Sequence, residues 1–256
     1  MDTQAQHSER DRSSEPDAGS GEGSRFSRTR GRLASVLSWR RVLAVAVLAT
    51  VALLLFSSYV VQPFLVPSGS MEPTLQVGDR VLVNKLAYRF GAEPQRGDVV
   101  VFDGTGSFVR EDLDANPLAG LVRGAAASLG LAEPADTDFV KRVVGVGGDR
   151  VVCCDKQGRL AVNGTVVDEP YLYPGDTASR VPFDIVVSAG TLWMMGDHRS
   201  RSSDSRDRLG SPGGGMVPVE RVTGRVDWLG RPPARVGPLT GTGAFGDVRA
   251  PGAAHG

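Results

Sequence analysis

One apolar run dominates the pattern of hydrophobic and polar positions along this chain. Residues 42–61, VLAVAVLATVALLLFSSYVV, are twenty positions without a charge, and no charged residue follows before Glu72. Twenty residues at helical rise span the hydrocarbon core of a bilayer, so the run predicts a transmembrane helix. It is longer than the core of a cleaved signal peptide and no Ala-x-Ala site follows it, which favours an uncleaved anchor. The alternative is a buried helix of a soluble protein, although such helices rarely stay apolar on every side for this length.

The charges around this run predict its orientation. Six arginines precede it within residues 25–41, without an acidic residue among them, and the first basic residue after it is Arg80. The positive-inside rule then makes the N-terminus cytoplasmic and places the chain beyond residue 62 outside the cell. Residues 1–24 are almost free of apolar side chains. We therefore expect residues 1–41 to be a disordered cytoplasmic tail that ends in a basic stretch.

Beyond the run, the pattern changes to short β-branched segments separated by turn residues. Gly-Asp pairs precede RVLV, VVVF and RVVCC, and LAV-Asn163-Gly164-TVV contains the Asn-Gly pair of a two-residue hairpin turn. VPFDIVV and TLWMM, joined by Ser-Ala-Gly, predict a second hairpin, and VTGRVDWLG predicts a closing strand. The expected fold is mainly β, with an antiparallel sheet or barrel-like domain over residues 62–230 behind a single N-terminal transmembrane helix.

Two segments depart from this β pattern. Residues 104–137 are rich in Gly, Ala, Asp and Pro, with a short helix predicted at PLAGLVRGAAASLGL, and we interpret them as an insertion or flap. After Leu229 the chain is rich in Arg, Pro, Gly and Ala without periodicity, which predicts a flexible tail over residues 231–256.

Composition narrows the range of functions. Basic and acidic residues number 29 each, which gives no indication of a nucleic-acid partner. With three histidines, two of them in the terminal tails, and two cysteines, a Cys/His zinc site is not expected, and no metal or cofactor is predicted. Cys153 and Cys154 are adjacent on a predicted strand. Because strand side chains alternate, two thiols on opposite faces are favoured over a strained disulfide between neighbours.

The basic residues are unusual in type, because only Lys85, Lys141 and Lys156 are lysines. Arginine cannot give up its proton and lysine can, so a lysine in this chain can mark a position where guanidinium would not serve. Lys141 alternates with apolar residues in the predicted strand DFVKRVVGVGGDRVV. Burial there would lower its pKa and leave a neutral amine that can act as a general base. The alternative is an ordinary solvent-facing lysine.

Two further segments supply hydroxyl groups. PSGSMEPTLQVGDRVLVNKL places Ser70 in a Pro- and Gly-containing loop just after the apolar run, where a scaffold could hold a nucleophile. Taken alone, Ser-Gly-Ser is more often an ordinary turn. MMGDHRSRSSDSRDRLG, residues 194–210, is a polar loop that could supply a hydroxyl to orient the lysine and an Asp–Arg pair to hold the loop.

Together, PSGSMEPTL, GDRVLVNK, RGDVVVF, VKRVVGVGGD and MGDHRSRSSDSR resemble the motifs of the type I signal peptidase family in its actinobacterial form. The resemblance implies a membrane-bound serine endopeptidase that removes N-terminal signal peptides from exported preproteins through a Ser–Lys dyad and an acyl-enzyme. It also implies substrates with small residues at the first and third positions before the cut, bound in an extended form. The implied location is the bacterial cell membrane, with the catalytic domain outside the cytoplasm.

The same resemblance assigns roles to individual residues. The catalytic pair is Ser70 as nucleophile and Lys141 as general base. The residues matched to supporting roles are Ser68 in the oxyanion hole, Ser202 as the serine that orients the lysine, Asp204 as the support of the same loop, and Arg142 and Arg206 as ion-pair partners of that support. His198 is a departure, because some members of the family carry Asn at this position.

Three other interpretations stay open. A Ser–His hydrolase would use His198 as its base, and His198→Asn would then abolish activity. A self-cleaving serine–lysine regulator is soluble and carries a DNA-binding helical unit, where this chain has a polar tail and an apolar run. A non-enzymatic surface domain or a degenerate peptidase is the third, although no catalytic position of the motifs is missing.

Overall fold

The computed structural model describes residues 27–109 and 137–251, and the chain divides into two compact units, Met1–Val51 and Ala52–Gly256. The segments predicted as a polar tail over residues 1–24 and as a short helix within 104–137 lie outside the described residues.

Helix α1 (Ser27–Tyr59) is longer than the apolar run that predicted it. Residues 27–41 are helical, so this part of the predicted disordered tail was assigned wrongly; the Arg, Leu and Ala residues of this stretch are good helix formers. Across the described residues, no helix combines the length and the apolarity that crossing a membrane requires.

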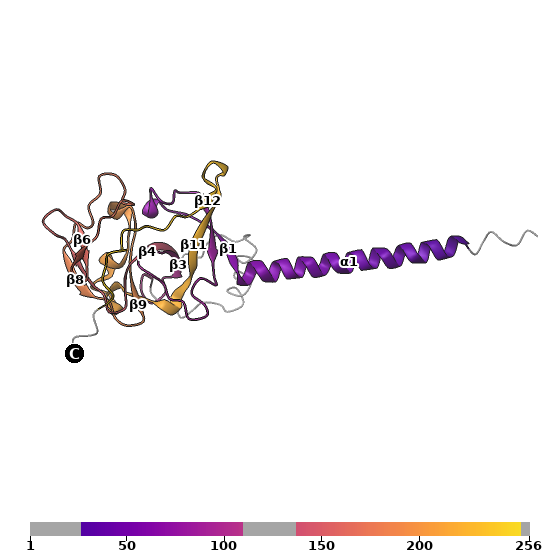
Figure 1. Ribbon diagram of the computed structural model, residues 1–256, viewed down its shortest axis with the longest axis horizontal. Helices are drawn as coiled ribbons and strands as arrows, with labels where there is room; N and C mark the ends of the chain where they lie inside the picture. Colours follow the sequence, from indigo (N-terminus) through magenta and orange to yellow (C-terminus); the bar gives the residue numbers. More distant parts are fainter. Residues whose placement is uncertain (1–26, 110–136, 252–256) are drawn as a thin grey trace, which may run out of the picture. The chain divides into compact units, whose positions relative to one another are not determined.

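The β unit contains two sheets whose strands pair antiparallel (Figure 1), as the sequence predicted. The larger sheet has the order β1-β2-β11-β3-β4-β9-β10, with β12 paired to β11, and the smaller has the order β7-β6-β5-β8. The strands of the larger sheet are β1 (Val61–Leu65), β2 (Arg80–Asn84), β3 (Val99–Asp103), β4 (Asp138–Val146), β9 (Thr191–Met195), β10 (Val217–Pro218), β11 (Val222–Arg231) and β12 (Gly237–Pro238). Those of the smaller sheet are β5 (Arg150–Cys153), β6 (Leu160–Val162), β7 (Thr165–Val166) and β8 (Phe183–Val186).

Of the two predicted hairpins, one is present and one is not. Asn163 and Gly164 both have positive φ, 51° and 78°, and β6 pairs with β7 across them. The predicted hairpin between β8 and β9 is wrong, because β8 pairs with β5 in the smaller sheet and β9 pairs with β4 in the larger. Alternation predicts that a segment is a strand, but it does not say which strand is its partner.

The chain passes between the sheets at two connections, β4 to β5 and β8 to β9, which lie against each other. Gly148 N–H donates to Val187 O at 2.8 Å, and Val187 N–H donates to Asp149 O at 2.7 Å. A Cβ at Gly147 would lie 3.1 Å from the Cα of Ala189, so a glycine permits this close approach.

Strand β3 is buried on both faces and fixes the surroundings of β4. Val99 and Val101 belong to one apolar cluster, and Val100 and Phe102 belong to another. In the register of β3 with β4, Val100 lies directly opposite Lys141. The lysine therefore extends from a strand that has apolar residues beside it.

The C-terminal segment differs from the flexible tail predicted for residues 231–256. Within the part described, up to Pro251, β12 pairs with the end of β11, and Phe245 and Val248 are buried in the cluster around Trp193. Two isolated apolar side chains are enough to fix a short segment, but they produce no periodic pattern in the sequence.

Phe245→Ala should lower the free energy of unfolding by about 3 kcal/mol, because it removes a buried aromatic side chain from this cluster. Urea denaturation of the purified protein measures the change. Val236→Ala is the matched control, since Val236 is 53% exposed in the same segment and should change little. Equal stability of the two variants would contradict the packing described for the C-terminal segment.

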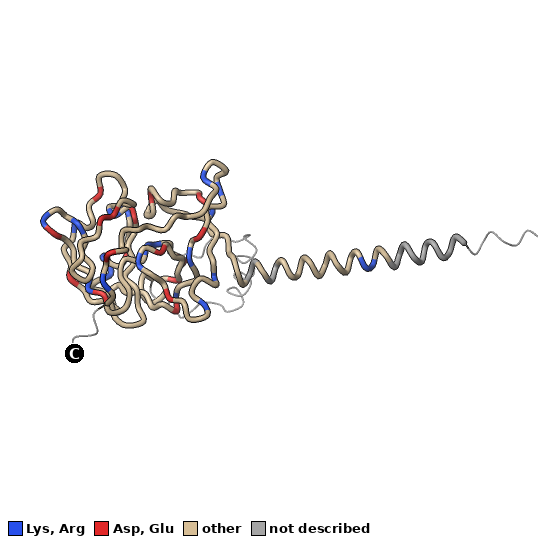
Figure 2. The backbone as a smooth tube through the Cα atoms, viewed as in Figure 1, with Lys and Arg blue, Asp and Glu red and all other residues tan. Residues whose placement is uncertain are grey.

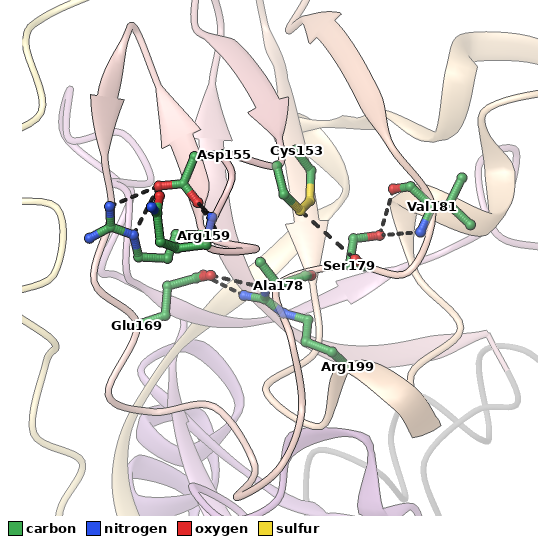
Figure 3. Close-up of a disulfide and its surroundings, with 10 residues drawn as sticks. Cys153, Asp155, Arg159, Glu169, Ala178, Ser179, Val181 and Arg199 are labelled. Atoms are coloured by element: carbon green, nitrogen blue, oxygen red, sulfur yellow. Dashed lines mark hydrogen bonds and ion pairs between the residues drawn. A yellow bond between two sulfur atoms is a disulfide. The ribbon is translucent and has the colours of Figure 1, made fainter.

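Cys153 and Cys154 form a disulfide (Figure 3), whereas two separate thiols were predicted. The prediction assumed that both residues lie in one strand. Strand β5 ends at Cys153, so the alternation of strand side chains does not extend to Cys154. Cys153 is buried, and Cys154 Sγ lies 3.8 Å from Ser179 O.

Candidate active site

Ser70 lies in a short turn, the 3-10 helix η1 (Gly69–Met71), on the connection between β1 and β2. The turn is closed by Glu72 N–H donating to Gly69 O at 3.2 Å and by Leu75 N–H donating to Met71 O at 2.8 Å. Met71 and Leu75 are 1% and 0% exposed, so their side chains fasten the turn to the core. The scaffold thus holds the Ser70 hydroxyl at a fixed place. Ser70 itself is buried.

Lys141 lies in β4 and meets Ser70 across this turn. Its Nζ is 2.6 Å from Ser70 Oγ, and only 4% of the residue is exposed. Burial disfavours the ammonium form and lowers the pKa of Lys141 to about 8; Asp204 and Asp197 oppose this shift, and Arg206 adds to it. A fraction of the amine is therefore neutral near pH 7 and can accept the proton of the serine hydroxyl.

The two other predicted hydroxyls lie close to this pair. Ser68 Oγ is 3.3 Å from Ser70 Oγ. Ser202 is buried, and its Oγ has no hydrogen-bond partner among the residues described. Ser202 and the Ser70 carbonyl both lie against Gly196, because a Cβ built on that glycine would clash with each of them. The structure thus brings Ser68 and Ser202 close to Ser70, without a hydrogen bond between Ser202 and Lys141.

Gly196→Ala should reduce activity at least about 100-fold, since a misplacement of catalytic groups by about an ångström has effects of this size. The new Cβ would lie 2.5 Å from Ser70 O and would also clash with Ser202. Neither neighbour can give way without moving Ser70 or Ser202, both predicted to belong to the catalytic machinery. An assay of the peptidase activity expected from the sequence measures the effect in the folded variant, and Gly210→Ala, whose new Cβ would have nothing within 4 Å, is the control. Wild-type activity in Gly196→Ala would contradict the packing described here.

Asp204 holds the loop that follows β9. Its carboxylate accepts hydrogen bonds from Arg206 Nε at 2.8 Å and from Gly196 N–H at 3.0 Å. Burial alone would raise the pKa of this carboxyl, but the hydrogen bonds and charge of Arg206, together with the Gly196 N–H, bring it below its usual range. The predicted pair of Asp204 and Arg206 is therefore present in the structure, and it fixes the glycine that separates Ser202 from Ser70.

Arg142, in contrast, pairs with Asp197 and not with Asp204. Arg142 Nε and Nη2 donate to the two carboxylate oxygens of Asp197 at 2.8 and 2.6 Å, and its guanidinium lies 4.1 Å from the ring centre of Tyr171. Side chains alternate along β4, so Arg142 points to the face opposite that of Lys141. Asp197 was missed in the sequence because the Asp197-His198 pair has the composition of an ordinary turn.

Sequence reasoning also missed a second buried ion pair, between Glu169 and Arg199 (Figure 3). Arg199 Nη2 donates to Glu169 Oε1 at 2.5 Å, and Arg199 Nη1 donates to Ala178 O at 2.9 Å. Tyr171 donates its hydroxyl proton to the same Glu169 oxygen at 2.7 Å. Proximity to Glu169 favours the charged form of Arg199 and, despite burial, raises its pKa. No short-range sequence signal joins residues this far apart.

His198 contacts Ser70 through its backbone, not through its imidazole. Its N–H donates to Ser70 O at 3.1 Å, and no hydrogen bond between the imidazole and Ser70 Oγ occurs in the described part of the chain. This geometry does not favour the Ser–His alternative. Among the residues described, no three His, Cys, Asp or Glu side chains are grouped as metal ligands.

The site is therefore a buried hydroxyl–amine pair, the arrangement of a serine hydrolase in which lysine takes the place of histidine. The family described as "Signal peptidase, peptidase S26" matches residues 39–229. The chain belongs to this family of serine peptidases.

Three relatives illustrate the similarity. Signal peptidase I of Mycobacterium tuberculosis (strain ATCC 25618 / H37Rv) is 37% identical over 245 residues, covering 87% of this chain and 83% of the relative. The probable signal peptidase I of Mycobacterium leprae is 38% identical over 224 residues, covering 75% and 77%. Signal peptidase I of Bacillus caldolyticus is 34% identical over 202 residues, covering 74% and 87%. A solved signal peptidase I from Enterococcus faecalis aligns with 52% of this chain and 97% of its own at 21% identity, with a TM-score of 0.33.

Proposed function

We propose that this protein is a membrane-bound serine endopeptidase that removes N-terminal signal peptides from exported preproteins. The observation that carries the proposal is the contact of 2.6 Å between Lys141 Nζ and Ser70 Oγ in a buried setting. Family membership, with a relative named signal peptidase I at 37% identity and a probable signal peptidase I at 38%, supports the substrate class.

In the proposed mechanism, neutral Lys141 takes the proton of Ser70 as the oxygen attacks the scissile carbonyl. The oxyanion is stabilised by the Ser70 backbone N–H and the Ser68 hydroxyl, and donors of this kind are worth about 3 kcal/mol each. Protonated Lys141 then gives its proton to the leaving amine, and water hydrolyses the acyl-enzyme. Ser202 orients the lysine amine, and Asp204 with Arg206 holds the loop that carries this serine.

The substrate is expected to bind in an extended form, with small residues at the first and third positions before the cut. Strand β1 supports this expectation, because it lies at the edge of the larger sheet and leads directly into the Ser70 turn. An edge strand offers unpaired backbone groups to which an extended peptide can add as a further strand.

The proposal includes a membrane anchor over residues 42–61, with the N-terminus in the cytoplasm and the catalytic domain outside. It is supported by the absence of charge from the whole run and by the six arginines that precede it. The sequence has no charged residue between Arg41 and the end of the helix at Tyr59, whereas acidic and basic residues are interspersed over the β strands and their loops in Figure 2. Fractionation tests the anchor: the protein should stay in the membrane pellet after a carbonate wash, and its release would argue against an anchor.

Cleavage of a preprotein by the full-length protein in detergent tests the proposed activity. We expect the wild type to release the mature domain at the signal-peptide junction and Ser70→Ala to release none. Failure to cut any presecretory protein, together with failure of an acylating reagent to label Ser70, would favour a non-enzymatic β domain instead.

A further inference from the structure

His198 contacts the turn of the nucleophile at two points. Its backbone N–H donates to Ser70 O at 3.1 Å, and its imidazole Nδ1 lies 3.4 Å from Oε2 of Glu72, two residues further along the chain. A single residue of the loop after β9 therefore touches the turn both at Ser70 and just beyond it.

Glu72 reaches back over the residue that precedes Ser70. A Cβ at Gly69 would lie 3.0 Å from Cδ and Oε1 of Glu72, so the carboxylate lies directly over this glycine. The peptide bond between Gly69 and Ser70 carries the N–H that the proposed mechanism uses as an oxyanion donor. A shift of the Glu72 carboxylate would therefore allow Gly69 to move, and with it the direction in which the Ser70 N–H points.

The imidazole is held in place on its other side by Tyr173. The two rings are stacked, with centroids 3.8 Å apart and planes 3° apart, and His198 is 5% exposed. Tyr173 is itself tied to the loop, because its N–H donates to Asp197 O at 3.1 Å. The ring of His198 consequently has little freedom to turn away from Glu72.

His198 Nδ1 is buried and has no well-formed hydrogen bond within the described residues, although the Glu72 carboxylate faces it. A buried polar atom without a partner is destabilising, so the Glu72 carboxylate is the acceptor that Nδ1 would bind if the two groups moved slightly closer. Hydrogen bonds of free active sites are often long and tighten when the substrate binds. A contact of this kind affects the reaction rate more than it affects the folded state of the free enzyme.

We propose that His198 and Glu72 form a positioning pair that fixes the Ser70 turn for catalysis, and that position 198 needs a hydrogen-bond donor where Nδ1 now lies. The inference rests on the proposed peptidase function of the Ser70 site. His198 acts through Glu72 and the backbone, and it is not the base. An asparagine at this position can place its amide nitrogen where Nδ1 lies, so His198→Asn should keep the contact.

The test compares kcat, KM and the melting temperature of full-length variants in detergent, with a preprotein as substrate. His198→Leu and Glu72→Leu should each lower kcat about tenfold, with KM and melting temperature little changed, since each removes the contact that tightens when the substrate binds. His198→Asn should stay within about twofold of the wild type, because it restores the donor. A residue that only stabilised the fold would change the melting temperature instead.

The double variant His198→Leu/Glu72→Leu should be no slower than either single variant, because each change removes the same contact. Glu93→Gln, at an exposed acidic residue, is the control and should leave kcat unchanged. Losses in kcat that multiply in the double variant would contradict the proposal that His198 and Glu72 act as one pair. A His198→Asn variant as slow as His198→Leu would contradict it as well. Wild-type cleavage that is lost in Ser70→Ala would leave the proposed function intact in either case.

Discussion

Lys141→Arg should abolish preprotein cleavage, with a loss of at least about 10⁴-fold in kcat, as expected when one member of a catalytic unit is removed. Arginine keeps the positive charge and much of the length of lysine, but its guanidinium does not release its proton in proteins. The variant therefore tests whether position 141 must supply a base or only a cation. A cleavage time course with excess enzyme would detect residual activity at this level.

Lys156→Arg is the matched control for this experiment. Lys156 is exposed, in the turn between β5 and β6, and its replacement should leave cleavage unchanged. Near-normal activity of Lys141→Arg would refute the assignment of Lys141 as the base, and the buried contact with Ser70 would then need another explanation.

Asp197→Asn should lower the free energy of unfolding by about 3–5 kcal/mol, the usual effect of removing one partner from a buried ion pair. Asp197 is 0% exposed and Arg142 3%, so the guanidinium would remain in the interior without a counter-charge. Asp197 also accepts a hydrogen bond from Thr74 at 2.5 Å, which ties the segment after the Ser70 turn to the loop after β9. Urea denaturation of the purified chain measures the loss.

Asp184→Asn provides the comparison, because it breaks an ion pair with Arg150 in which both side chains are largely exposed. Exposed ion pairs often contribute nothing measurable, so this variant should unfold like the wild type. If both variants unfolded at the same urea concentration, the pair of Arg142 with Asp197 would not be the buried support described above.

Much of the fold was predictable because its determinants are local. The strand at RVLV and the turn at Asn163-Gly164 follow from β-branched runs and from two residues that tolerate positive φ. The partner of β8 was not predictable, because the pairing depends on a crossover in which Gly147 lies against the opposite connection. The packing of Phe245 was missed for a similar reason, since one apolar residue in a Pro- and Gly-rich segment has no periodicity.

The candidate site divides in the same way. Ser70 and Lys141 could be selected from motifs and from the rarity of lysine, and the structure places them 2.6 Å apart. The pairing of Arg142 with Asp197 could not be predicted. It depends on which face of β4 each side chain occupies and on a residue 55 positions further along the chain. Ion pairs between distant segments leave no mark in a single sequence, and such pairs hold the loop that lies against Ser70.

The pH dependence of kcat/KM for preprotein cleavage tests the central claim most directly, because only the neutral amine of Lys141 can act as the base. Burial lowers the pKa of this lysine to about 8, so the reactive form grows as pH rises through that value and is lost as pH falls below it. We expect the rise of kcat/KM to be centred near pH 8 and to level off well above that value. A rate that is constant across this range, or one whose rise is centred near the usual histidine pKa of about 6.5, would contradict the account.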